Sequence, residues 1–349
     1  MKTFTFLILL ILLLVSITAV AAACSGADDA SSPAEAPGAA AAPGAPVSGP
    51  VGWTILPQFP PREVVISRRL LGLNDLIMLD ENTGWIVGTD GAIGRTTDRG
   101  DTWVLQKTGT AINLTAVSFV DTQNGWVIGT AGTVLRTSDG GDTWEKLDSI
   151  KGVLFTEGVQ FVNLTTGWVA ADFGSIFHTT DGGLTWAKQD TGSLEDLNDL
   201  FFVDDQTGWA VGFGGAILHT ADAGTTWTAQ ESGGDTQLNS VWFVDSNVGA
   251  VVGQSGTILY TTDGGANWTP QQSGTTEDLV GVHFFDPQNG WAVGSKNIVI
   301  HTSDGGATWA QQETLVAADS LRGIYLTSLR SGLAAGSGGH IWKYGPVGQ

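Results

Sequence analysis

Residues 197–227 read LNDLFFVDDQTGWAVGFGGAILHTADAGTTW, and this stretch decides the fold. It contains short apolar or alternating runs at 197–203, 208–212 and 216–220, each followed by a turn rich in Gly or Asp. Strand-length runs with such boundaries are typical of antiparallel β-structure, and no segment is long enough for a helix. We expect the fourth strand of the unit at its closing residue, Trp227.

The same unit recurs along the chain with a period of about 41 residues. Tryptophans preceded by Thr or Asn close the units at intervals of 41 or 42 residues: Trp103, Trp144, Trp186, Trp227, Trp268 and Trp309. A second set, preceded by Gly, stands 18 residues earlier in five units: Trp85, Trp126, Trp168, Trp209 and Trp291. Two units carry Gly249-Ala250 and Gly332-Leu333 at that position. Self-similarity at such a period indicates a repeat architecture.

Four antiparallel strands in each repeat define the blade of a β-propeller. Six complete units run over about residues 73–315, and a seventh, at 321–344, supplies only three strands. The missing outer strand is expected at the other end of the chain, at residues 52–56. Pairing this strand into the last blade closes the ring and removes the open edges that a linear array would expose. The sequence therefore predicts an all-β, seven-bladed propeller of four-stranded blades over residues 51–345.

A segment Ser/Thr-x-Asp-x-Gly-x-Thr-Trp closes each complete unit, with Asn267 in place of the last Thr in one copy. This segment is the Asp-box known from sialidase-like propellers. We expect its aspartate to accept backbone N–H bonds in the turn between the third and fourth strands, and its Gly to take a positive φ. The other carboxylates of a calcium loop are absent, which favours a structural role. The aspartates are Asp98, Asp139, Asp181, Asp222, Asp263 and Asp304.

The N-terminal residues have the parts of an export signal. Lys2 is followed by an almost unbroken apolar run at 6–20 and then by three alanines. This run is shorter than a membrane-spanning helix requires. Residues 21–24, Ala-Ala-Ala-Cys, resemble the lipobox of bacterial lipoproteins, whose cysteine carries diacylglycerol on its sulfur. We therefore expect a signal peptide at 1–23 and lipidation of Cys24. A plain secretory signal with an incidental thiol is the alternative.

Residues 25–50 contain only Ala, Gly, Pro, Ser, Asp, Glu and one Val. Such a segment has nothing with which to bury a core, so residues 24–50 are expected to form the lipidated cysteine and a disordered tether. Two or more acyl chains hold a protein stably on a membrane. The sequence therefore predicts an extracytoplasmic protein that Cys24 anchors to a bacterial membrane.

The chain is strongly acidic, with 35 Asp and Glu against 15 Lys and Arg and a formal net charge of −20. A body of this charge repels phosphate backbones, so nucleic acid is not expected as a partner. The same charge keeps a protein soluble outside the cell. A single cysteine allows no internal disulfide, so the fold must be held by packing and hydrogen bonds.

The span 53–345 resembles the photosystem II assembly and stability factors of cyanobacteria and chloroplasts. The likeness is carried by the Gly-Trp-x-Val-Gly second strands, by the Thr-x-Asp-Gly-Gly-x-Thr-Trp closings, by the N-terminal closing strand and by the lipobox. It implies a non-enzymatic, monomeric propeller that binds a membrane protein or complex subunit. Photosynthetic members carry an arginine-rich patch in the middle blades, whereas no arginine occurs here between Arg136 and Arg322. This departure favours a cousin with another partner.

A search for catalytic chemistry finds little. Sialidases need an arginine triad, a Tyr–Glu pair and a Phe-Arg-Ile-Pro segment, and that tetrapeptide is absent. A glycosidase-type carboxylate pair stays open, because four candidate residues are expected near the inner strands: Asp75, Glu157, Asp199 and Arg322. No zinc-protease, Cys-x-x-Cys, serine-hydrolase or P-loop motif is present. We therefore expect no enzyme, no catalytic residue and no cofactor.

Histidines on the third strands do not point to a metal site. His178, His219 and His301 share one register, so the repeat disperses them farther apart than zinc ligands allow. We expect them to cover a tryptophan or to hydrogen-bond between blades. The sequence therefore predicts no metal-binding residue.

Residues that break the repeat with usable chemistry are the candidates for partner binding. One inner-strand register varies freely: Ile77, Ser118, Gln160, Phe201, Trp242, His283 and Tyr325. Packing between blades is the alternative explanation of this variation. The candidate partner-binding residues are Trp242, His283, Arg322 and Tyr325. Our first hypothesis is a binding and assembly scaffold, and the alternative is a sialidase-like propeller that binds or hydrolyses glycans.

Overall fold

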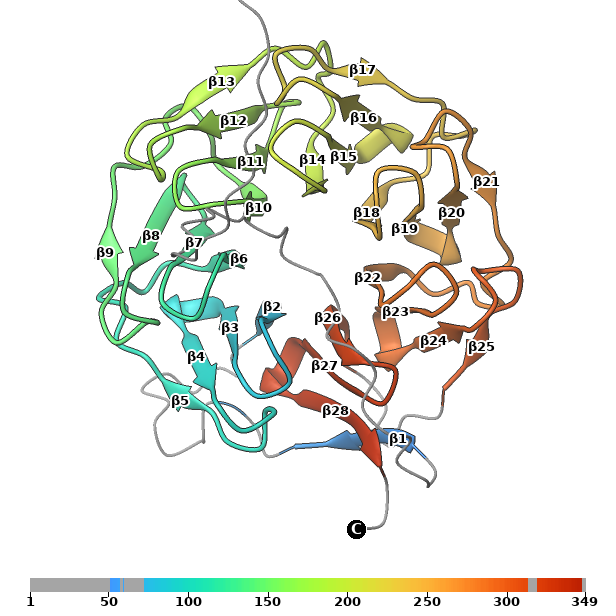
Figure 1. Cartoon of the computed structure of the whole chain (residues 1–349), viewed down its shortest axis with the longest axis horizontal. Coiled ribbons are helices and arrows are strands. Elements are labelled where there is room, and N and C mark those ends of the chain that lie inside the picture. Colours follow the sequence, from blue (N-terminus) through green and yellow to red (C-terminus); the bar gives the residue numbers. More distant parts are fainter. Residues whose placement is uncertain (1–50, 57–58, 60–71, 313–318, 347–349) are drawn as a thin grey trace, which may run out of the picture. The chain divides into compact units, whose positions relative to one another are not determined.

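Seven four-stranded antiparallel sheets stand around one axis as the blades of a ring (Figure 1). They come from a computed structural model that describes residues 51–56, 59, 72–312 and 319–346. The expected signal peptide, Cys24 and the tether lie outside these described residues. The prediction of a seven-bladed propeller is confirmed.

Each blade runs from an inner strand at the axis to a short outer strand at the rim (Figure 1). The strands of blades 1 to 4 are β2 (Leu73–Met78), β3 (Gly84–Gly88), β4 (Ile93–Thr96), β5 (Val104–Leu105), β6 (Leu114–Phe119), β7 (Gly125–Gly129), β8 (Thr133–Thr137), β9 (Glu145–Lys146), β10 (Thr156–Phe161), β11 (Gly167–Ala171), β12 (Ile176–Thr179), β13 (Ala187–Gln189), β14 (Leu197–Phe202), β15 (Gly208–Gly212), β16 (Ile217–Thr220) and β17 (Thr228–Ala229). The strands of blades 5 to 7 are β18 (Leu238–Phe243), β19 (Gly249–Gly253), β20 (Ile258–Thr261), β21 (Thr269–Pro270), β22 (Leu279–Phe284), β23 (Gly290–Gly294), β24 (Val299–Thr302), β25 (Ala310–Gln311), β26 (Leu321–Ser328), β27 (Ser331–Gly336), β28 (Ile341–Pro346) and β1 (Val51–Ile55).

Short 3-10 turns join the second and third strands in five blades: η2 (Thr89–Gly91), η3 (Phe213–Gly215), η4 (Gln254–Gly256), η5 (Ser295–Asn297) and η6 (Ser337–Gly339). The closing tryptophan of each complete unit stands just before its outer strand, and not within it, so the sequence prediction is displaced by one residue. Trp227, for example, precedes β17, and its indole packs edge-on against Phe202 of the same blade at 6.0 Å between ring centroids.

The ring is closed by the two ends of the propeller sequence. Strand β1 pairs antiparallel with β28, so that the last sheet has the order β1-β28-β27-β26. Trp53 lies opposite Tyr344 in this pairing, and their ring centroids are 5.1 Å apart. The expected closing strand at 52–56 is therefore confirmed, with observed bounds one residue earlier. Blade 7 therefore has its outer strand, β1.

Contacts between neighbouring blades repeat one aromatic arrangement. The tryptophan of a second strand stacks on the phenylalanine that ends the next blade's inner strand, as for Trp85 on Phe119 at 3.6 Å between ring centroids. The Trp85 indole N–H also donates to the Gly140 carbonyl in the closing turn of that next blade, at 3.1 Å. The same stack joins three further pairs at 3.5–3.7 Å: Trp126–Phe161, Trp168–Phe202 and Trp209–Phe243.

The glycine before each of these tryptophans is required by close approach. A Cβ at Gly125 would lie 2.4 Å from the Phe119 ring, and one at Gly208 would lie 2.5 Å from the Phe202 ring. Any larger residue would therefore displace the ring on which the preceding blade's tryptophan stacks. The Gly-Trp pair of the repeat therefore serves two contacts between blades. Its tryptophan stacks on the ring of the next blade, and its glycine leaves room for the ring of its own blade.

Two blades lack the tryptophan and fill its place differently. Blade 5 has Ala250, and the Tyr260 opposite it extends to blade 6, where its hydroxyl donates to the Pro287 carbonyl at 3.0 Å. Blade 7 has Leu333, which is 2% exposed and packs against the closing turn of blade 1 near Gly100. Both substitutions keep an apolar or aromatic side chain in the gap between blades.

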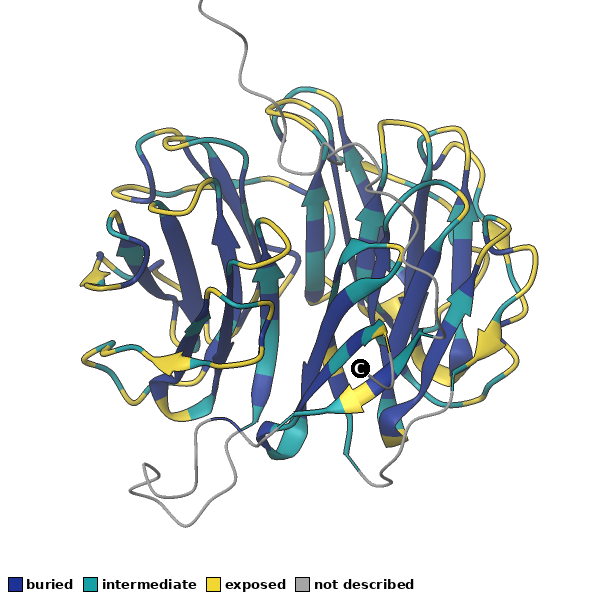
Figure 2. Ribbon diagram, turned by 60° about the horizontal axis from the view of Figure 1, so that its bottom comes forward, coloured by how far each residue is buried: buried dark blue, intermediate teal, exposed yellow. Residues whose placement is uncertain are grey.

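Burial follows this architecture. Buried residues fill the strands, whereas exposed residues gather in the loops at the two ends of the blades and in the short outer strands (Figure 2). The second strand of every blade is buried almost along its whole length, because it is covered on both faces by neighbouring blades. Among the described residues, no helix has the length and apolar character needed to cross a bilayer.

We predict that Trp53→Ala destabilises the whole propeller. Trp53 is 3% exposed and packs in the core of blade 7, so its truncation should cost about 3–5 kcal/mol of unfolding free energy. Thr54→Ala is the matched control, because Thr54 is exposed on the same strand and should change stability by about 0.5 kcal/mol or less. Urea unfolding followed by tryptophan fluorescence and by circular dichroism measures both. An unchanged midpoint for Trp53→Ala would show that β1 does not hold the ring together.

Candidate functional site

A central channel runs along the inner strands of the described propeller. Its wider part, of about 520 Å³, is lined by the first residues of the inner strands and by the turns at Thr89, Thr130 and Ser337. Its narrower part, of about 160 Å³, lies farther along the same inner strands. Asp75, Asp199 and Arg322 line both parts. The channel therefore has a polar mouth at one face of the ring, which we call the wide mouth.

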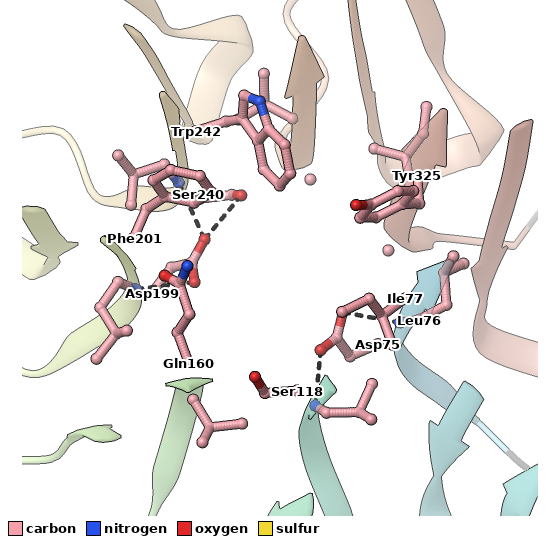
Figure 3. A pocket seen from close by; sticks show the side chains of 18 of the residues that line it. Asp75, Leu76, Ile77, Ser118, Gln160, Asp199, Phe201, Ser240, Trp242 and Tyr325 are labelled. Carbon is pink, nitrogen blue, oxygen red and sulfur yellow. Dashed lines mark hydrogen bonds between the residues drawn. The ribbon is translucent and has the colours of Figure 1, made fainter. Parts of the chain in front are cut away.

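Two carboxylates, Asp75 and Asp199, face this channel from different sides of its open centre (Figure 3). Each stands at a β-bulge of its inner strand and joins two blades. Asp75 accepts the backbone N–H of Leu76 at 2.8 Å and that of Val117 in blade 2 at 2.9 Å. Asp199 accepts the N–H of Val241 in blade 5 at 3.0 Å and the Ser240 hydroxyl at 2.9 Å. Both carboxylates are thus part of the contact between inner strands.

Burial in the ring raises the pKa of both groups. The pKa of Asp75 rises to about 7, mainly through loss of solvent and also through the negative charge of Asp199. The pKa of Asp199 rises to about 6, again mainly through burial, although its hydrogen bonds oppose the shift. These carboxyl groups therefore change charge near neutral pH, which is a property shared with many general acids.

The wide mouth carries a second polar layer, one residue earlier in each inner strand. Asn74 donates to the Leu114 carbonyl of the next blade at 2.7 Å, and Arg322 donates to the Asn74 side-chain carbonyl at 3.0 Å. Glu157 is exposed in this layer. Partial loss of solvent around its carboxyl group raises the pKa of Glu157, the charge of Arg322 opposes that rise, and the charges of Asp172 and Asp196 add to it. Arg322 therefore partly balances a mouth that is otherwise acidic.

Three of the four residues predicted to bind a partner form one aromatic cluster in neighbouring blades. The ring of His283 lies 4.1 Å from that of Trp242 and 4.5 Å from that of Tyr325, by centroid distance. The Trp242 indole donates to the Phe284 carbonyl of blade 6 at 2.9 Å. Trp242 and Tyr325 line the narrower part of the channel, as Figure 3 shows. Arg322 stands apart, nearer the wide mouth.

His283 is the least accessible of these candidates, with 3% of its surface exposed. Burial lowers the pKa of His283 to about 3 and raises the pKa of Tyr325 to about 12, so both rings stay neutral at physiological pH. Among the described residues the His283 Nδ1 atom has no hydrogen-bond partner. The geometry of the cluster is that of packing between blades 5, 6 and 7.

The closing turns use their aspartates within the turn. Asp139 accepts the Thr143 N–H at 2.9 Å and the hydroxyls of Thr143 and Thr137 at 2.6 and 2.8 Å. Hydrogen bonds from the Thr143 side chain and backbone lower the pKa of Asp139 to about 2. Gly141 in the same turn has a φ of +93°. The backbone bond recurs at Asp98, Asp181, Asp222, Asp263 and Asp304, and at Asp263 the side-chain amide of Asn267 replaces the threonine hydroxyl.

The third-strand histidines lie over the tryptophans opposite them. His178 stacks on Trp168 at 4.8 Å between ring centroids, and His301 stacks on Trp291 at 4.1 Å. Their expected place over a tryptophan is confirmed. In the described part of the chain, no group of three or more His, Cys, Asp or Glu is arranged to hold a metal ion.

Sequence reasoning missed five exposed apolar residues around the wide mouth: Leu154, Phe155, Phe173, Leu194 and Phe213. They occupy loop and turn positions, which lie outside the tryptophan pattern of the strands. A comparison of turn positions would have found them, since the equivalent residues of other blades are mostly small or polar.

Taken together, the ring and its channel define a closed, seven-bladed propeller in which Asp75 and Asp199 bond to neighbouring blades. The family model described as photosynthesis system II assembly factor YCF48 matches three successive segments of this ring, at 105–193, 186–272 and 267–332. The matches span most of the propeller, and the chain belongs to this family. The predicted resemblance is therefore confirmed.

Solved structures of the same fold include relatives and unrelated enzymes. YCF48 from Cyanidioschyzon merolae has a TM-score of 0.68 and 19% identity, covering 84% of this chain and 98% of that one. YCF48 bound to a D1 peptide has a TM-score of 0.69 and 19% identity, covering 85% and 96%. A catalytically inactive virginiamycin B lyase from Staphylococcus aureus, with quinupristin, has a TM-score of 0.71 and 11% identity, covering 85% and 100%. At these identities the likeness is one of fold. No curated protein sequence matches the chain.

We predict that the two channel carboxylates make the propeller less stable as pH rises from about 4 to 7. Their folded-state pKa values of about 7 and about 6 lie above the ordinary aspartate value of 3.8, so the protonated forms favour the folded state. This stability is present below pH 4 and is lost as pH passes through the folded pKa, by about 2–4 kcal/mol for Asp75. Asp75→Asn should flatten the dependence of the melting temperature on pH between 4.5 and 7.5.

Asp205→Asn is the control for this experiment, because Asp205 lies exposed in a loop of blade 4. It should leave the pH profile of the melting temperature unchanged. A profile for Asp75→Asn that parallels the wild-type profile would contradict the assignment of raised pKa values to the channel.

Proposed function

We propose that this chain is a lipid-anchored, non-enzymatic scaffold that binds a membrane protein, or a subunit of a membrane complex, outside the cytoplasm. The observation that carries the proposal is the family, whose model matches successive segments across most of the ring. A YCF48 of this family has been solved bound to a D1 peptide. By analogy, the propeller of this chain acts as a monomer that holds a polypeptide of its partner.

The interior of the ring supports binding over turnover. Asp75 and Asp199 are the two channel carboxylates whose pKa is raised most. Each accepts backbone N–H groups from its own strand and from the next blade. A general acid or base must reach a substrate with its proton-transferring atom. Carboxylates already held by these donors are better suited to joining blades than to transferring protons.

We propose that the partner of this chain differs from the partner that photosynthetic members of the family bind through an arginine-rich patch. No arginine occurs between Arg136 and Arg322, a span that contains the whole of blades 3 to 6. A photosystem subunit is therefore one partner class within the family, and another extracytoplasmic membrane subunit is the class that we favour. Its contact with this chain must use other chemistry than guanidinium groups of the middle blades.

An enzymatic alternative rests on one observation, the pair of channel carboxylates with raised pKa. Propellers of this fold include enzymes such as the virginiamycin B lyase. A glycan-binding or glycoside-hydrolysing propeller would use Asp75 or Asp199 as its acid, with Arg322 and Tyr325 nearby in the channel. This alternative and the scaffold make opposite predictions about turnover.

We predict that Cys24→Ser releases the protein from membranes without changing its fold. The motif at 21–24 places the only cysteine directly after the cleavage region, and acylation at its sulfur supplies the anchor. Ser31→Ala in the expected tether is the matched control and should stay with the membrane. Fractionation after a high-salt wash measures both. Membrane pelleting of Cys24→Ser equal to that of wild type would refute the anchor.

We predict capture of a stoichiometric membrane partner and no hydrolysis by the same preparation. The full chain is cross-linked in membranes of its source organism, and the captured subunit is quantified against the bait. Chromogenic glycosides, including a sialoside, are assayed in parallel with wild type, Arg322→Ala, Tyr325→Ala and Asp199→Asn. Robust hydrolysis by wild type that any of these changes abolishes would replace the scaffold with an enzyme.

A further inference from the structure

Five large apolar side chains stand exposed at one end of blades 3 and 4. Their exposed fractions run from 40% to 85%, and we call this set the apolar rim: Leu154, Phe155, Phe173, Leu194 and Phe213. Soluble proteins leave single apolar side chains exposed, but a gathered patch of them marks a contact site. Half of the large apolar residues exposed in the described structure belong to this set.

Hydrogen bonds show that the rim is continuous across the two blades. The Asp172 carboxylate accepts the backbone N–H of Leu154 at 2.9 Å, which brings 154–155 beside Phe173. The Phe173 N–H donates to the Asp196 side chain at 2.7 Å, and the Phe213 N–H donates to the Asp196 backbone carbonyl at 2.9 Å. The four segments therefore form one connected surface.

The rim departs from the repeat at positions where other blades are small or polar. Phe173 occupies the middle of the turn between the second and third strands, where the other blades have Asp90, Ala131, Gly214, Ser255, Lys296 and Gly338. Phe155 directly precedes an inner strand, where the other blades have Gly72, Asn113, Asp196, Gln237, Asp278 and Ser320. Packing does not require an aromatic residue at either position, because the same turn forms without one.

Phe173 also adopts an unfavourable backbone conformation for its size. Its φ is +54°, in the left-handed region that bulky residues rarely enter, and its side chain is 63% exposed. The glycines at the equivalent turn positions of blades 4 and 7 adopt the same region without strain. The chain therefore keeps an exposed phenylalanine where glycine would be more stable.

The rim borders the wide mouth of the channel and is surrounded by negative charge. The turns that begin with Thr89, Thr130 and Ser337 line this mouth, and Asp172 and Phe213 begin the corresponding turns of blades 3 and 4. The loops 148–157, 172–174, 190–196 and 213–215 contain one basic residue, Lys151, and the acidic residues Asp148, Glu157, Asp172, Asp190, Glu195 and Asp196. Loss of solvent around the carboxyl group is the main cause of the raised pKa of Glu157; the charges of Asp172 and Asp196 add to the rise, and the charge of Arg322 opposes it.

We propose that the apolar rim docks a polypeptide segment in which two or three large apolar side chains adjoin a Lys or Arg. The apolar side chains pack on Phe155, Phe173 and Leu194, and the cation faces Glu157 at the wide mouth. This inference rests on the proposed scaffold function and names its contact surface. Charge complementarity selects this occupant, because an anionic lipid surface or a second copy of this acidic chain would bring like charges together.

The test uses the full chain and two fluorescein-labelled peptides, GSLFLFKKGS and its acidic counterpart GSLFLFEEGS, in fluorescence anisotropy. Wild type should bind the lysine peptide at least tenfold more tightly than the acidic one, with affinity that falls as salt rises. Phe173→Gly and Leu194→Ser should each weaken binding at least fivefold, and Glu157→Gln should reduce the salt dependence. Phe173→Gly should melt at the same or a higher temperature, which separates lost binding from lost folding.

Leu184→Ser is the matched control, because Leu184 is 55% exposed in the closing turn of blade 3, at the opposite end of the blade. It should bind the lysine peptide within twofold of wild type. The proposal is overturned if wild type binds neither peptide or both equally, or if Leu184→Ser loses as much affinity as Phe173→Gly.

Two other occupants are outcomes of the same experiment. Sedimentation with phosphatidylcholine vesicles that Phe173→Gly abolishes, without peptide binding, would assign the rim to a membrane surface. A dimer that Phe173→Gly dissociates would assign it to a second copy; either result overturns the peptide. Equal capture of the membrane partner by wild type and Phe173→Gly would be consistent with the scaffold function but would show that the apolar rim is not its contact surface. Peptide binding without any captured partner would refute the scaffold function alone.

Discussion

The structure depends on one repeated contact, in which a buried tryptophan of one blade stacks on the aromatic ring that ends the next blade's inner strand. Its ring separation is 3.6 Å for Trp85 on Phe119, and the indole N–H is bonded to the closing turn of the same neighbour. Stacking sets the distance between blades, and the directional N–H bond sets their rotation. Trp85, Trp126, Trp168 and Trp209 make this contact. At the other three boundaries Tyr260, Trp291 and Leu333 fill the gap between blades, and the pairing of β1 with β28 closes the ring.

Closure of the ring determines the chemical environment of the residues that line the central channel. Seven inner strands facing one axis place Asp75 and Asp199 in a narrow channel, where burial raises their pKa and backbone donors of the next blade hold them. The variable residues Trp242, His283 and Tyr325 fill the same interior as packing. The proposed partner contact therefore lies at the loops around the wide mouth, which make none of the contacts between blades that the tryptophans make.

The sequence predicted the fold closely, because each blade repeats one local pattern. That pattern contains both the strands of the blade and the residues that contact the next blade. Counting tryptophans was enough to place β1 in the last blade. The candidate site was predicted less well. Arg322 and Tyr325 do line the channel, but the raised pKa of Asp75 arises from its burial in the assembled ring and from the charge of Asp199, which no local spacing in the sequence shows. Leu154 and Phe173 come together only because Asp172 bonds one loop to the next, so their proximity is a property of the fold and not of spacing.

The central claim is that this propeller holds a polypeptide at the loops of blades 3 and 4 and leaves its channel unused for chemistry. Hydrogen–deuterium exchange of the full chain, with and without its cross-linked partner subunit, tests that claim most directly. We predict new protection confined to residues 153–155, 172–174, 193–196 and 213–215, with unchanged exchange in the inner strands and closing turns. Protection centred on Leu76 and Val117 beside the channel carboxylates, or on the closing turns at the opposite face, would contradict the account.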